Sequence, residues 1–191
     1  PYGNKIPKGA VLVTANHRSF FDPIILLVAF PSRRLHCLAT KDLYSTKFRE
    51  FYFDKMHCIK VDKENFTMSA FHDIVERLNE NCMVVIFPEG QLNTDTNASI
   101  LAFKSGAALM AHKANAPILP VYIVKRDRWY QRQRVVIGEP YYIRDEIGNM
   151  PSLEQLNAAS DTLRQKEVAL REYFESLPIY QKLNSSKNKT N

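Results

Sequence analysis

The stretch that decides the fold is Val11-Leu12-Val13-Thr14-Ala15-Asn16-His17. Its aliphatic and β-branched residues predict a buried strand, and the polar Asn16-His17 pair indicates that the chain leaves the core at that point. Similar runs alternate with helical patterns along the 191 residues, which predicts an α/β fold with a mainly parallel mixed sheet flanked by helices. We expect strands at 10–14, 34–39, 57–61, 82–87, 118–124 and 134–137.

The helical patterns lie between these strands and after the last of them. We expect helices at 23–30, 66–79, 99–113 and 153–177. The last begins with a capping box, Ser152-Leu153-Glu154-Gln155, and ends at Pro178. The length predicts a single domain over 1–183, and the polar, lysine-rich tail at 184–191 is expected to be disordered.

The segment after the first strand holds the first candidate for chemistry. It reads Asn16-His17-Arg18-Ser19-Phe20-Phe21-Asp22-Pro23, and open α/β sheets bind ligands at the carboxyl ends of their strands. Asp22 follows His17 by five residues, a spacing that lets a carboxylate meet an imidazole and prepare it as a general base. Asp22 followed by Pro23 is also the usual pair for a helix N-cap. The two roles are compatible.

The spacing between His17 and Asp22 is not specific by itself, because His57 and Asp62 repeat it. The second pair falls on the strand expected at 57–61, where residues five apart point to opposite faces and lie about 17 Å apart. We therefore expect His57 to be structural.

A second polar segment, Phe87-Pro88-Glu89-Gly90, follows the strand expected at 82–87. Glu89 would lie beside His17 if both strands are central and parallel, and an ordinary turn carboxylate is the alternative. Gly90 permits close approach of the backbone to a ligand.

Positive charge is the third feature. The net charge of +6 and the pI near 9.2 favour nucleic acid, acidic lipid or a phosphorylated substrate as partner. Lys60, in a predicted strand, and Lys104, early in a predicted helix, are candidates to bind phosphate, although most such lysines extend to solvent. The basic and aromatic stretch 125–134 is either a solvated loop or a contact with nucleic acid or an anionic bilayer.

Together these segments resemble the glycerolipid acyltransferases, in particular the 1-acylglycerol-3-phosphate (lysophosphatidate) acyltransferases. The resemblance covers residues 2–145. Its blocks, in family order, are Asn16-His17-Arg18-Ser19-Phe20-Phe21-Asp22, Cys58-Ile59-Lys60-Val61-Asp62, Phe87-Pro88-Glu89-Gly90 and Ala116-Pro117-Ile118-Leu119-Pro120-Val121, and Phe103-Lys104-Ser105-Gly106 also matches.

Two blocks depart from the family pattern. Lys60 stands where the second block usually has Arg, and Gln91-Leu92 stand where the third usually continues with Thr-Arg. A lysine cannot reproduce the bidentate fork of arginine. Either Lys104 or Arg18 holds the phosphate instead, or the acceptor is not a simple lysophosphatidate.

The resemblance implies transfer of a fatty acyl group from acyl-CoA or acyl carrier protein to the free hydroxyl of a lysophosphatidate-type glycerolipid. His17 is then the general base and Asp22 its partner, with Ser19 at the helix entry rather than acting as a nucleophile. No cofactor is expected beyond the acyl co-substrate, and the histidines lack metal-ligand spacing, so no metal is expected. The expected substrate-binding residues are Arg18, Ser19, Lys60, Glu89, Gly90 and Lys104.

These substrates imply a peripheral protein at the inner, cytoplasmic face of the membrane, with apolar surface near Phe20 and Phe21 or Trp129-Tyr130 touching lipid and with no nucleic acid as partner. The longest apolar run, 24–30, is far shorter than the ~20 residues that span a bilayer. The alternatives are an acyltransferase for a different lysolipid or hydroxyl acceptor, and a non-enzymatic module that binds anionic lipid or nucleic acid.

Overall fold

The centre of the molecule is a six-stranded sheet in the order β3-β2-β4-β1-β5-β6. In the computed structural model, which describes residues 6–40, 44–55, 57–61, 68–94, 100–126 and 132–178, the first five strands pair in parallel and β6 runs antiparallel to β5. The predicted α/β fold with a mainly parallel mixed sheet is confirmed. The strands are β1 (Val11–Ala15), β2 (Leu35–Thr40), β3 (Ile59–Val61), β4 (Met83–Ile86), β5 (Ile118–Ile123) and β6 (Val135–Ile137).

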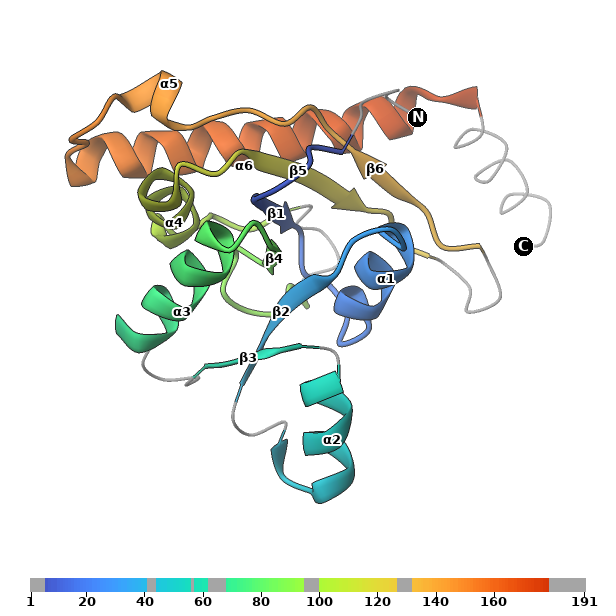
Figure 1. Cartoon of the computed structure of the whole chain (residues 1–191). Coiled ribbons are helices and arrows are strands. Elements are labelled where there is room, and N and C mark those ends of the chain that lie inside the picture. The colour runs from blue at the N-terminus through green and yellow to red at the C-terminus, as the bar shows by residue number, and fades with distance from the viewer. Residues whose placement is uncertain are drawn as a thin grey trace.

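Helices cover both faces of this sheet (Figure 1). Helix α1 (Asp22–Ala29) packs on one face, while α3 (Met68–Asn79), α4 (Gly106–Ala114) and α6 (Leu153–Ser176) pack on the other. Helix α6 runs along one end of the molecule, with the short α5 (Arg144–Ile147) against it, and α2 (Lys47–Lys55) lies at the opposite end beyond β3. In the part of the chain that the structure describes, no helix combines the length and apolarity needed to cross a bilayer.

The alternation of side chains along β1 explains why this strand is central. Val11, Val13 and Ala15 pack towards α1, whereas Leu12 packs into the core formed with α3, α4 and α6. All five residues of β1 are buried, as expected for a parallel strand covered on both faces. The residues that directly follow β1 are therefore the first that can reach the rim of the sheet.

The helix predicted at 99–113 is wrong in its first part, because α4 begins only at Gly106. Residues 101–104 belong to neither a helix nor a strand. In this connection Leu101 N–H donates to the Glu89 carboxylate and Lys104 N–H donates to Pro88 O. The alanine and leucine content favours a helix, but these long-range hydrogen bonds hold the backbone away from helical geometry.

The strand predicted at 57–61 also begins later, at Ile59. His57 lies in the preceding turn with a φ of 54°, its ring 5.6 Å from the ring of His36, and Asp62 lies outside the described residues. Helices α2 and α5 were not predicted. The tail at 184–191 and the Trp129-Tyr130 pair also lie outside the described residues.

Candidate active site

The first strand and first helix bring His17 and Asp22 together. Nδ1 of His17 lies 3.0 Å from Oδ2 of Asp22, and the same oxygen accepts the backbone N–H groups of Arg18 at 2.7 Å and Ser19 at 2.8 Å. The Asp22 side chain is 2% exposed and that of His17 20%. Because three donors converge on one buried oxygen, the loop between the two residues has a single arrangement that keeps the carboxylate against the imidazole.

The structure separates the two roles considered for Asp22. The N-cap residue of α1 is Phe21, without a side-chain cap, and Asp22 is the first helical residue. Its carboxylate therefore binds the loop before the helix instead of capping the helix itself. Ser19 lies at the helix entry, where its hydroxyl accepts the N–H of Phe21.

The imidazole of His17 is fixed from a second side by Phe87. The two rings are stacked, with centroids 4.0 Å apart and planes 17° apart. Asp22 holds one ring nitrogen and Phe87 covers a ring face, so Nε2 is the nitrogen that remains for a substrate. A hydrogen-bonded carboxylate fixes the tautomer of the ring and stabilises its protonated form.

Glu89 lies beside His17, where neighbouring parallel strands end together. Its Oε1 accepts the N–H of His17 at 2.9 Å and its Oε2 accepts the N–H of Leu101 at 3.2 Å. Burial raises the pKa of Glu89, while these two N–H groups, the neighbouring His17 side chain and the positive charge of Arg18 oppose the increase. The carboxylate thus holds the backbone of His17 in place.

Gly90 and Lys104 lie against each other next to Glu89. Gly90 has a φ of 69°, and a methyl group added there would lie 2.7 Å from Cε of Lys104. Lys104 precedes α4 and is exposed. Its side chain thus lies across the glycine turn and places a positive charge at this rim.

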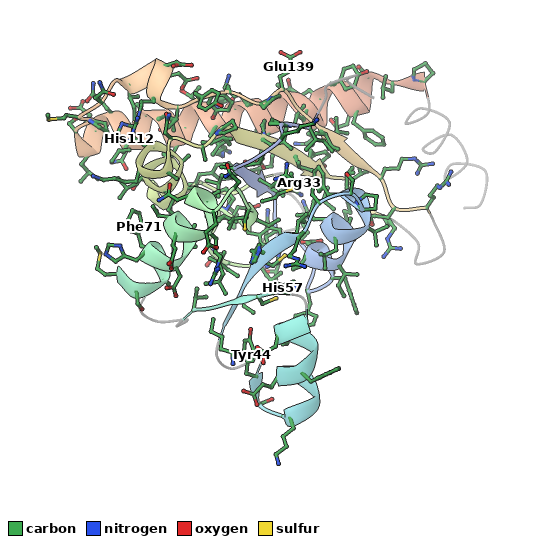
Figure 2. The ribbon with its side chains drawn as sticks, in the orientation of Figure 1. Arg33, Tyr44, His57, Phe71, His112 and Glu139 are labelled. Carbon is green, nitrogen blue, oxygen red and sulfur yellow. The ribbon has the colours of Figure 1, made fainter. Side chains whose placement is uncertain are left out.

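Lys60 is not brought to His17. It lies on the edge strand β3, separated from β1 by β2 and β4, and its Nζ is 3.4 Å from Glu50 and 3.6 Å from Asp54 of α2. The same Nζ lies 4.3 Å from the ring centroid of Tyr44, which Figure 2 shows beside α2. Two carboxylates therefore already balance the charge of this lysine.

Asn16 is a site residue whose role sequence reasoning missed. It is fully buried, and its side chain accepts the N–H of Ile123 at 2.7 Å and donates to the C=O of Ile123 at 3.2 Å. The amide thus continues the pairing of β1 with β5 by one more residue and directs the chain outward at His17. An amide directly after an apolar strand was the available signal.

Comparisons with known proteins identify the family of this chain. Residues 2–124 match the family model described as Acyltransferase. The chain belongs to the acyltransferase family. The matched range contains His17, Asp22, Glu89 and Gly90, so the resemblance found in the sequence is confirmed and the chain is an O-acyltransferase.

The similarity to two acyltransferases covers more of the chain than residues 2–124. The 1-acyl-sn-glycerol-3-phosphate acyltransferase of Bacillus subtilis is 28% identical over 171 residues, covering 87% of this chain and 83% of that protein. The probable 1-acyl-sn-glycerol-3-phosphate acyltransferase of Mycoplasma pneumoniae is 31% identical over 194 residues, covering 88% and 69%.

A solved acyltransferase structure shares the fold. The crystal structure of the 1-acyl-sn-glycerophosphate (LPA) acyltransferase of Thermotoga maritima superposes with a TM-score of 0.64 at 22% identity, covering 90% of this chain and 70% of that one. Among the residues described here, no group of three His, Cys, Asp or Glu side chains is placed to hold a metal ion.

Proposed function

We propose that this acyltransferase moves a fatty acyl group from a thioester, acyl-CoA or acyl carrier protein, to the free hydroxyl of a lysophosphatidate-type glycerolipid. The observation that carries the proposal is the 3.0 Å contact between His17 Nδ1 and Asp22 Oδ2 at the carboxyl end of a central strand. The relatives named for 1-acyl-sn-glycerol-3-phosphate support this class of acceptor.

The orientation of His17 supports the following mechanism. Nε2 removes the proton from the acceptor hydroxyl as the oxygen attacks the thioester carbonyl. The tetrahedral intermediate then expels the thiolate, the carbon–sulfur bond breaks, and the protonated imidazole returns its proton to sulfur. Asp22 stabilises the positive charge that His17 carries between the two steps. The scheme uses neither a metal nor an acyl-enzyme.

We further propose that the outer side of α1 and the loop before it touch the membrane that supplies the acceptor. Phe20, Phe21 and Val28 are 54%, 59% and 75% exposed. Exposed apolar side chains that gather at one place are typical of protein or lipid contacts. The place of action is then a membrane surface, which we expect to be the inner face.

A donor and acceptor panel tests the reaction. Purified protein is incubated with long-chain acyl-CoA or acyl carrier protein and, separately, lysophosphatidate, glycerol 3-phosphate or a lysophospholipid whose phosphate is a diester. We expect thiol release that requires lysophosphatidate and yields a diacyl product. Release only with another acceptor would replace the proposed substrate, and no release with any pair would contradict the proposal.

A further inference from the structure

An open cavity of about 450 Å³ adjoins Asp22 on the side of the carboxyl end of β5. Its size falls within the range of small-ligand sites, and His17 is not among its lining residues. The cavity therefore suits a part of a substrate other than the reacting hydroxyl and thioester. The lining residues are Arg18, Ser19, Asp22, Ile25, Asn93, Thr94, Ile123, Val124, Lys125, Arg126 and Gln133.

The charge of this lining favours an anion. Arg18, Lys125 and Arg126 contribute three positive charges, and Asp22 is the one carboxylate among the lining residues. Oδ2 of Asp22 is already bound by three N–H groups. Ser19 and Thr94 add side-chain hydroxyl donors. Clustered arginine and lysine with such donors is the chemistry that binds phosphate.

The walls of the cavity are held by hydrogen bonds. Gln133 Nε2 donates to Val124 O at 2.8 Å and to Arg134 O at 3.0 Å, which fixes the base of the segment that carries Lys125 and Arg126. On the other side, Asn93 N–H donates to His17 O at 2.7 Å. The cavity is therefore joined to the backbone of His17 and has limited freedom relative to it.

The other candidate cations, Lys60 and Lys104, are less suited to bind a phosphate group. Lys60 lies on the edge strand β3, separated from β1 by β2 and β4. Lys104 is a single point charge across Gly90. The cavity brings three cations together, two of them arginines able to bind two phosphate oxygens at once.

We propose that this cavity binds a phosphomonoester group of one of the two substrates. The proposal rests on the proposed acyl transfer for the identity of the substrates. The same chemistry has two sources: the phosphate of a lysophosphatidate-type acceptor, or the 3′-phosphate of the CoA donor.

Calorimetric titration tests the cavity without requiring turnover. Glycerol 3-phosphate and CoA serve as soluble probes of the two sources, with the wild-type chain, the double variant Lys125→Ala/Arg126→Ala and the control Lys113→Ala. Lys113 is an exposed cation at the end of α4. We expect the double variant to bind at least one probe about tenfold or more weakly, because charge-assisted hydrogen bonds are lost, and the control to match the wild type.

The result also identifies the source. If the double variant loses affinity for glycerol 3-phosphate alone, the cavity binds the phosphate of the acceptor. If it loses affinity for CoA alone, the cavity binds the phosphate of the donor. In the turnover assay the KM for that same substrate should rise, with kcat changed less than about twofold. Equal binding by the wild type and the double variant, or no binding of either probe by the wild type, would overturn the proposal. If the double variant loses affinity for a probe but the wild type shows no acyl transfer, the phosphate site is supported and the proposed reaction is rejected.

Discussion

Replacing Glu167 by glutamine should stabilise the protein increasingly as the pH rises. Glu167 lies on α6 with 0% exposure, and neither carboxylate oxygen has a hydrogen-bond partner of normal geometry within the described residues. Burial raises the pKa of Glu167 well above its usual range, the charge of Glu89 raises it further, and the facing Thr14 hydroxyl lowers it in part. The folded protein thus keeps this side chain protonated at a pH where the unfolded chain has lost the proton.

The sign and size follow from proton linkage. Above the pKa of the unfolded carboxyl, the folded state binds more protons, so the free energy of unfolding falls as the pH rises through the folded pKa. The slope from one such group approaches about 1.4 kcal/mol per pH unit, which corresponds to about 3–6 °C in Tm for a domain of this size. Glutamine is neutral at every pH and similar in shape, and it removes this dependence.

The assay is thermal and urea unfolding of the wild type and Glu167→Gln from pH 5 to pH 8. Glu172→Gln is the matched control, because Glu172 lies exposed on the same helix. We expect the difference between Glu167→Gln and the wild type to widen with pH and the control to show no such trend. Parallel stability curves for the wild type and Glu167→Gln would refute the assignment of a neutral buried carboxyl.

Three further substitutions follow from the site. Asp22→Asn removes the charge that supports the imidazole of His17, the proposed base, so kcat should fall about 10²–10⁴-fold in the CoA-release assay; a fall under tenfold would contradict the proposed role of Asp22. Gly90→Ala places a methyl group 2.7 Å from Lys104 Cε at a φ of 69° and should cost about 1–3 kcal/mol in urea unfolding, and an unchanged midpoint would argue against this turn. Asn16→Ala leaves the N–H and C=O of Ile123 unpaired and should destabilise by about 1–3 kcal/mol per buried group, with an unaltered melting curve as the opposing result.

The sheet, and the proximity of the polar segments that contain His17 and Glu89, could be predicted from the sequence. Buried parallel strands appear as short aliphatic runs, and the carboxyl ends of such strands share one edge, so His17 and Glu89 were expected to meet if β1 and β4 were central. The strand order, in which β1 and β4 are neighbours, confirms that condition. The contact between His17 and Asp22 could also be predicted, because only a loop and the first turn of a helix separate the two residues.

The remaining features depend on contacts between residues distant in sequence. Glu89 captures the Leu101 N–H, which overrides a local helical pattern. Lys125 and Arg126 appeared as part of a basic stretch, but their convergence with Arg18 depends on β5 lying beside β1. Glu167 falls at helical spacing between Leu163 and Leu170 on the buried face of α6, but the spacing alone does not show whether its carboxyl stays buried or reaches solvent.

His17 is proposed to act in acyl transfer as the base held by Asp22. The most direct measurement is CoA release from long-chain acyl-CoA with lysophosphatidate, comparing the wild type, His17→Ala and His72→Ala. His72 lies exposed on α3 and controls for loss of a histidine, and thermal unfolding confirms that each variant is folded. We predict that His17→Ala lowers kcat about 10²–10⁴-fold while His72→Ala keeps wild-type activity. A folded His17→Ala variant with activity close to that of the wild type would contradict the account.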